Sequence, residues 1–191
     1  MSSEEQLKKR LLLITGSPGV GKTTLLLKVI EALRAKGYTV GGMISREVRM
    51  SGDRVGFEVT DLNSDKKGWL ASVHQERGPQ VGKYRVDIDD LNEVGVKAIL
   101  EACEKLDVAV IDEIGPMELF SEQFKETVKK AVESKKLVVS TIHRKIGNEF
   151  IDSIKKRGDA EIHILTYVNR EHMLETIIGE ALEFLSKVDA E

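Results

Sequence analysis

The chain has 191 residues, of which 41% are hydrophobic and 32% are charged. This length allows one domain with a sizeable core, and the balance of apolar and charged residues is typical of a globular protein rather than a disordered one. The formal net charge of −3 argues against a dedicated nucleic-acid binder, because phosphate contacts need a basic surface. Cys103 is the one cysteine, so an internal disulfide and a cysteine-rich zinc site are excluded.

The start of the chain carries charges of both signs over residues 1–10, and the apolar run that follows covers only residues 11–14. Such a run is too short for the apolar segment of a secretion signal or for a membrane span. We therefore expect a cytoplasmic protein without a membrane partner.

The first predicted element is the apolar strand at residues 11–14, which leads into a glycine-rich stretch. Gly16, Gly21, Lys22 and Thr23 occupy every fixed position of the template G-x-x-x-x-G-K-[ST]. Glycines allow backbone angles at which successive N–H groups point inward around an anion. Apolar residues then recur with helical spacing, so a helix N-terminus adds its unpaired amides. The sequence therefore predicts a phosphate site whose nucleotide-binding residues are Gly16, Ser17, Pro18, Gly19, Val20, Gly21, Lys22, Thr23 and Thr24.

Two side chains of this stretch have distinct predicted roles. Lys22 supplies a mobile positive charge for the β- and γ-phosphates and spreads the charge that develops during reaction, so we assign it a catalytic role. The hydroxyl of Thr23 supplies a hard oxygen ligand for Mg²⁺.

After a second predicted strand at residues 39–45, the stretch 46–89 has a different pattern, because short β-prone pieces alternate with glycine-containing turns. Val55, Phe57 and Val59 alternate as the inward residues of a half-buried strand do. About 45 residues without a helix would form a poor core alone, so we expect antiparallel hairpins inserted in a larger domain. Their predicted strands cover residues 47–50, 55–62 and 68–73, with a turn at 51–53.

The rest of the chain alternates between predicted helices and strands. Helices are expected at residues 90–105 and after the predicted caps Ser121, Asn148 and Asn169. Strands are expected at residues 108–111, 137–140 and 162–165. This alternation indicates βαβ crossovers, so we predict one α/β domain over residues 1–191, with three layers and a mostly parallel central sheet.

Ligands of such sheets bind beyond the carboxyl ends of the parallel strands. Gly16, Asp112 and Thr141 follow three predicted strands and should meet in one crevice. Asp112 comes after four apolar residues, where a carboxylate is placed to hold Mg²⁺ opposite Thr23, directly or through water. Glu113 points in another direction and is placed to orient a water that attacks the γ-phosphate. The alternative for Glu113 is an ordinary surface acid.

Several further side chains follow the predicted strands and have two possible roles. Thr141 either hydrogen-bonds the γ-phosphate or is an ordinary turn residue, and His143 either reaches the crevice or stays in its loop. Tyr167 and Asn169 lie where the base of a nucleotide often rests, although Asn169 fits a helix cap equally well. Candidates to neutralise charge, each with a solvated surface role as the favoured alternative, are Arg46, Arg49, Arg144 and Arg170.

Three stretches of sequence together resemble one known family. They are Gly16-Ser-Pro-Gly-Val-Gly-Lys-Thr-Thr-Leu25, the hairpin Arg46-Glu-Val-Arg49 with Arg54-Val-Gly-Phe57, and Val110-Ile-Asp-Glu-Ile-Gly-Pro-Met-Glu-Leu119. With residues 141–170, they are similar to the thermophile-type nucleoside-triphosphatases, whose animal relative is called cancer-related nucleoside-triphosphatase. The first stretch is shared by a large superfamily, whereas the other two are more particular.

This resemblance implies a RecA-like P-loop fold with an added β-hairpin region. It also implies Mg²⁺-dependent hydrolysis of ATP, GTP, CTP and UTP with little discrimination between bases, and Glu113 as the catalytic acid or base. Thr141-Ile-His143 stands where the family pattern leads us to expect Thr-Ile-Pro, which leaves the role of His143 open. The second nucleotide-binding segment that the resemblance implies consists of Val108, Ala109, Val110, Ile111, Asp112, Glu113, Ile114 and Gly115.

Two other functions stay open at this point. A kinase for a nucleotide or another small acceptor would use the same loop, with the hairpin arginines as a lid. A nucleotide-driven switch for RNA or a protein partner is opposed by the acidic balance of the chain. For the hydrolase we expect a monomer, and slow turnover because no arginine finger is identifiable from the sequence.

Overall fold

The computed structural model describes residues 9–144 and 147–188. A sheet of nine strands forms its centre. The strands are β1 (Leu11–Gly16), β2 (Val40–Met50), β3 (Asp53–Asp61), β4 (Lys67–Ser72), β5 (Gln80–Val81), β6 (Tyr84–Val86), β7 (Val108–Ile114), β8 (Leu137–Ile142) and β9 (Ala160–Leu165). The helical segments are α1 (Lys22–Ala35), α2 (Ile88–Asp90), η1 (Leu91–Val96), α3 (Lys97–Lys105), η2 (Glu118–Phe120), α4 (Glu122–Glu133), α5 (Glu149–Lys155) and α6 (Arg170–Val188).

The sheet has the strand order β5-β6-β4-β3-β2-β7-β8-β1-β9 and is mixed rather than mostly parallel. Neighbours from β2 through β7, β8 and β1 to β9 are parallel, whereas the pairs from β2 outward to β5 are antiparallel. The prediction of a mostly parallel sheet was wrong because β2 continues to Met50 instead of ending at Ser45. Its free edge carries unpaired backbone groups, and the hairpin strands satisfy them by extending the same sheet.

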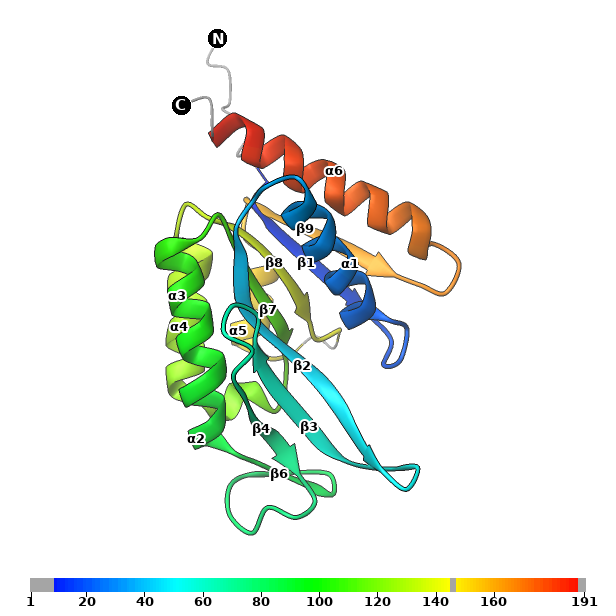
Figure 1. Ribbon diagram of the computed structural model, residues 1–191, viewed down its shortest axis with the longest axis vertical. Coiled ribbons are helices and arrows are strands. Elements are labelled where there is room, and N and C mark those ends of the chain that lie inside the picture. Colours follow the sequence, from blue (N-terminus) through cyan, green and yellow to red (C-terminus); the bar gives the residue numbers. More distant parts are fainter. Residues whose placement is uncertain (1–8, 145–146, 189–191) are drawn as a thin grey trace.

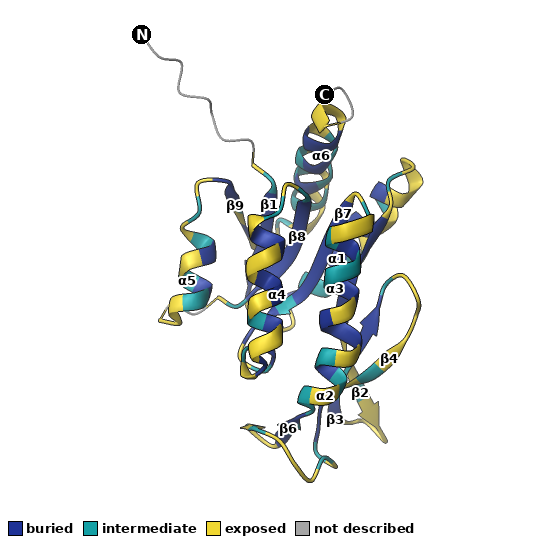
Figure 2. Ribbon diagram, turned by 90° about the vertical axis from the view of Figure 1, so that its left-hand side faces the viewer, coloured by how far each residue is buried: buried dark blue, intermediate teal, exposed yellow. Residues whose placement is uncertain are grey.

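Helices cover both faces of the parallel strands, with α1 and α6 on one face and α3, α4 and α5 on the other (Figure 1). Leu12 and Ile14 of β1 pack with α1 and α6, whereas Leu11 and Leu13 pack on the opposite side. This alternation follows from the two-residue period of a strand. Figure 2 shows that the buried side of α4 faces the sheet.

Several local predictions are confirmed, and others needed the tertiary structure. Ser121 and Asn148 cap α4 and α5 with their side-chain oxygens, as expected. Cys103 packs partly buried against the core, and burial raises the pKa of its thiol to about 11. The helix predicted from residue 90 instead begins at Ile88, because the Asp87 side chain caps the backbone N–H of Asp90. Within the described ranges, no helix is long and apolar enough to cross a membrane.

Candidate active site

Residues 17–21 connect β1 to α1 and leave the N-terminus of that helix open. Gly16 ends β1 so close to β9 that a Cβ there would lie 2.6 Å from the carbonyl oxygen of Leu165. Gly21 has φ +97°, and among the described side chains none caps the helix that it begins. The first-turn amides of α1 and the positive end of its dipole are therefore available to an anion.

Lys22, the first residue of α1, turns back over this loop. Its Nζ atom lies 3.4 Å from the carbonyl oxygen of Gly16 and 3.5 Å from that of Ser17. Both contacts are long for charged hydrogen bonds, so they hold the ammonium group weakly. A phosphate oxygen would be a better acceptor for it.

Asp112 lies at the centre of the site and is only 2% exposed. Its carboxylate accepts hydrogen bonds from Thr23 Oγ1 at 2.9 Å and from Thr141 Oγ1. Burial raises the pKa of Asp112, and these hydrogen bonds oppose the shift. Asp112 and Thr141 lie within β7 and β8 rather than after them, and together with Thr23 at the start of α1 they meet in one hydrogen-bonded group.

Glu113 is aimed at the loop by an irregularity in β7, whose register against β8 shifts between Ile111 and Ile114. The peptide bond between Asp112 and Glu113 is cis. A Cβ on Gly115 would lie 3.0 Å from Glu113 Oε1, so the carboxylate packs over that glycine. Burial raises the pKa of Glu113, and the positive charge of Lys22 lowers it.

Lys22, Thr23 and Glu113 line a crevice with a volume of about 590 Å³, whereas Asp112 and Thr141 are buried and do not line it. One wall is the loop with the start of α1, and the opposite wall comes from the hairpin formed by β2 and β3. Its lining residues are Gly16, Ser17, Pro18, Gly19, Gly21, Lys22, Thr23, Thr24, Ser45, Glu47, Arg54, Phe57, Glu113, His143 and Arg144. The presence of hairpin side chains here was not predictable, because local sequence patterns do not show where an inserted hairpin lies.

Part of the second predicted nucleotide-binding segment is inside the protein. Five residues of β7 are 0% exposed, namely Val108, Ala109, Val110, Ile111 and Ile114. Their side chains pack in the two halves of the core. Their role is to place Asp112 and Glu113, so the expectation of direct nucleotide contact is corrected for Val108, Ala109, Val110, Ile111 and Ile114. The side chain of Val20 is also buried, at 1% exposure.

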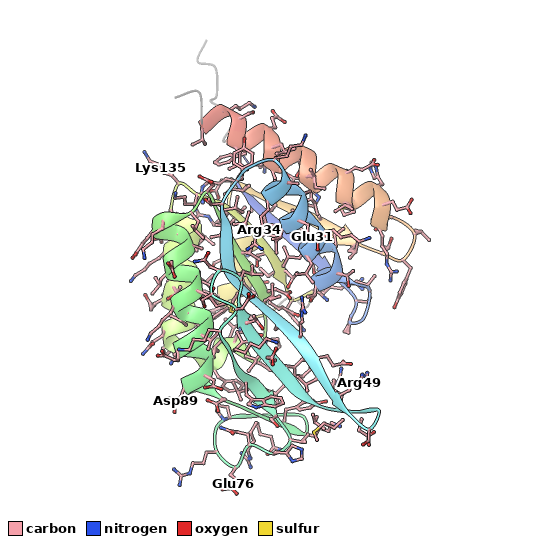
Figure 3. The ribbon with its side chains drawn as sticks, in the orientation of Figure 1. Glu31, Arg34, Arg49, Glu76, Asp89 and Lys135 are labelled. Atoms are coloured by element: carbon pink, nitrogen blue, oxygen red, sulfur yellow. The ribbon has the colours of Figure 1, made fainter. Side chains whose placement is uncertain are left out.

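The candidate arginines lie at different positions relative to the crevice. Arg144 donates to Ser17 Oγ at 3.2 Å and lines the crevice. Arg46 is exposed and points away from Glu47, because successive side chains of a strand alternate. Arg49 lies near the tip of the hairpin (Figure 3), where it donates to Glu47 and to the carbonyl of Gly52.

A second hollow of about 320 Å³ lies on the other side of the loop. Its lining residues are Gly19, Gly21, Thr24, Leu25, Lys28, Arg170, Glu171 and Leu174. Arg170 donates from Nε to the carbonyl of Val20 at 3.0 Å, and its guanidinium lies 4.9 Å from the centre of the Tyr167 ring. Asn169 stabilises the turn after β9, accepting from Thr166 at 2.8 Å and donating to Ile164 at 2.9 Å. Nucleotide contact by Asn169 stays a prediction.

A buried acid without a predicted role lies behind Glu113. Glu118, in the turn η2, is 4% exposed, and its pKa is raised to about 8, chiefly by burial and further by the charge of Glu113. The sequence signal was an acid between Met117 and Leu119, in a stretch that is otherwise apolar. In the described part of the chain, no group of three or more His, Cys, Asp or Glu side chains forms a metal site.

Comparison with known proteins shows the same combination of elements elsewhere. The NTPase family model matches residues 11–178. The chain is 48% identical over 160 residues to nucleoside-triphosphatase THEP1 of Thermofilum pendens, covering 83% of this chain and 88% of that protein. It is 43% identical over 169 residues to nucleoside-triphosphatase THEP1 of Methanocaldococcus jannaschii, covering 88% and 95%.

Two solved structures are similar in fold. The crystal structure of THEP1 from the hyperthermophile Aquifex aeolicus has a TM-score of 0.75 at 32% identity, covering 87% of this chain and 96% of that chain. The solution structure of a human cancer-related nucleoside triphosphatase has a TM-score of 0.76 at 34% identity, covering 89% and 96%. The fold of the present chain is thus that of known nucleoside triphosphatases.

Proposed function

Because this chain belongs to the nucleoside-triphosphatase family of the THEP1 proteins, we propose that it hydrolyses nucleoside triphosphates to diphosphates and phosphate with the aid of Mg²⁺. It is an enzyme of the hydrolase class, as its relatives are. The observation that carries the proposal is the hydrogen bond between Thr23 and Asp112, which joins the open end of α1 to the acidic end of β7.

The donor set at this point suits Mg²⁺. One hydroxyl and one carboxylate, 2.9 Å apart, supply hard oxygen ligands and leave the remaining positions to phosphate and water. Thr23 and Asp112 would hold the ion, which when bound neutralises charge on the phosphate oxygens. We propose that residues 16–24 bind the phosphates through backbone amides and Lys22.

Glu113 has the role of orienting the attacking water. Its carboxylate faces the crevice and is partly buried, and its raised pKa makes it a better proton acceptor than an exposed glutamate. The water oxygen forms the new bond to the γ-phosphorus while the bond to the β–γ bridging oxygen breaks. The water proton passes to Glu113 and from there to the products, so atoms and charge balance.

The second hollow supports broad use of ATP, GTP, CTP and UTP. It adjoins the loop at Gly19 and Gly21, and it offers the flat guanidinium of Arg170 beside the apolar Leu25 and Leu174. Stacking on a flat cation and apolar contact depend little on which base is present, because every base has a π face. We propose that the base lies there.

The relatives do not favour the kinase alternative, because their names are those of triphosphatases. We further propose that residues 1–191 form one RecA-like domain and act as a monomer. The support for one domain is that the hairpin strands continue the same sheet as β2 and β7.

The test is incubation of the purified protein with each of the four triphosphates and Mg²⁺, without any acceptor. Steady release of phosphate from all four, abolished by chelation of the metal, is the expected result. Phosphate release that appears only when a small acceptor is added, together with a phosphorylated acceptor, would replace the hydrolase with a kinase.

A further inference from the structure

The β2–β3 hairpin carries a charged cluster that has no assigned role in the proposed hydrolysis. Arg54 donates from Nη1 to Glu47 at 2.9 Å and from Nε to the phenolic oxygen of Tyr84 at 2.8 Å. Its guanidinium also lies 5.4 Å from the ring centre of Phe57 and 5.8 Å from that of Tyr84. Contacts from β2, β3 and β6 therefore fix the position of one cation.

This cluster faces the phosphate site. Glu47, Arg54 and Phe57 line the same crevice as Lys22 and Glu113, on the wall opposite the loop. Figure 1 shows the hairpin extending from the end of the sheet at which α1 begins. Ser45, which comes two residues before Glu47 on β2, lines the same crevice as the metal-binding residue Thr23.

Arg54 combines a fixed position with an accessible charge. Its side chain is 45% exposed, although both Glu47 and Tyr84 hold it. Glu47 also binds Arg49, so this carboxylate is shared between two arginines and does not fully neutralise Arg54. A guanidinium that is oriented in advance loses less entropy when it binds an oxyanion than a free side chain does.

We propose that Arg54 is a catalytic residue that contacts the γ-phosphoryl oxygens and stabilises the charge developing on them, so that the hairpin supplies an arginine finger within the same chain. This role rests on the proposed hydrolysis. Triphosphatases gain roughly 10³–10⁵ in rate from such a residue. The other arginines of the site are less suited, because Arg144 binds Ser17 on the loop and Arg170 binds Val20 beside the second hollow.

The decisive experiment compares Arg54→Gln with Lys67→Gln. Lys67 is an exposed cation on β4 that pairs with Glu58 at 2.8 Å, so the control removes one positive charge from the same sheet extension. With ATP and Mg²⁺, Arg54→Gln is expected to lower kcat by roughly 10³-fold or more and to change KM little. Lys67→Gln should keep the kcat of the unaltered protein.

A second readout separates catalysis from structure. The unaltered protein should form a stable complex with ADP, Mg²⁺ and aluminium fluoride, a mimic of the transferring phosphoryl group, whereas Arg54→Gln should bind ADP equally well without retaining the fluoride. Tyr84→Phe removes only the phenolic oxygen that holds Arg54. It should lower kcat by about tenfold, an effect of moderate size for the loss of one positioning contact, at an unchanged unfolding temperature.

The proposal is overturned if Arg54→Gln keeps kcat within about threefold of Lys67→Gln, if only KM rises, or if the fluoride complex persists. Should Arg54→Gln fail to fold, a kcat of Tyr84→Phe equal to that of the unaltered protein overturns it as well. A refutation of the hydrolysis proposal itself would be distinguishable, because the unaltered protein would then release no phosphate.

Discussion

Replacing Glu118 by glutamine tests whether this buried acid is neutral in the folded protein. The side chain is 4% exposed behind Glu113, and its pKa of about 8 lies well above the ordinary value of 4.5. Its carboxyl group therefore keeps its proton in the folded state at neutral pH, whereas it ionises in the unfolded chain. Glutamine has nearly the same shape and stays neutral in both states.

The difference of about 3.5 pH units between the two pKa values sets the size of the effect. At about 1.4 kcal/mol per unit, this one group lowers the free energy of unfolding by up to about 5 kcal/mol as the pH rises from 4.5 to 8. The sign follows because the folded state holds a proton there that the unfolded state has released. Below that range both states are protonated, and Glu118 adds no dependence on pH.

The assay is unfolding by guanidinium chloride without nucleotide or metal, at several pH values between about 5.5 and about 7.5. In Glu118→Gln the decline of unfolding free energy with pH should be shallower by up to about 1.4 kcal/mol per pH unit. Glu122→Gln is the matched control, because Glu122 is 81% exposed and pairs with Lys125. Equal slopes in Glu118→Gln and the unaltered protein would show that Glu118 is ionised inside the fold, and the reasoning would be wrong.

Three further substitutions test the site directly. Glu113→Gln should lower kcat by roughly 10²–10⁴-fold while nucleotide affinity stays similar, as measured by phosphate release and titration with a fluorescent nucleotide; normal turnover would remove Glu113 from the mechanism. Asp112→Asn should raise the Mg²⁺ concentration for half-maximal activity by about tenfold or more, and an unchanged requirement would contradict metal binding by Asp112. Gly16→Ala would bring a Cβ within 2.6 Å of the Leu165 carbonyl, so a loss of about 1–3 kcal/mol is expected in thermal unfolding. Gly179→Ala, whose Cβ would meet nothing within 4 Å, should cost nothing, and equal stability of the two variants would refute the close approach.

Local chemistry made the phosphate loop predictable. Gly16, Gly21, Lys22 and Thr23 stand at fixed spacing between an apolar strand and an amphipathic helix, and each has a role that its residue type explains. Caps such as Ser121 were predictable for the same reason, because a cap involves only neighbouring residues. Features of this kind are encoded within about ten residues of chain.

The hairpin shows why other parts were not predictable. Its alternation of apolar and polar residues indicates strands, but it does not say with which strand they pair. The structure joins β3 to the extended edge of β2, and this pairing makes the sheet mixed and brings Arg54 to the crevice. For the same reason the sequence did not reveal that Glu118 is buried beside the charge of Glu113.

The sequence by itself determined that an anion-binding loop opens a helix in an α/β protein, and that acids follow a buried strand. Only the tertiary structure decided which side chains face that loop across the crevice, since strand order and register bring together residues far apart in the chain. Thr23 and Asp112, 89 positions apart, meet at 2.9 Å because the carboxyl ends of parallel strands share one edge of the sheet.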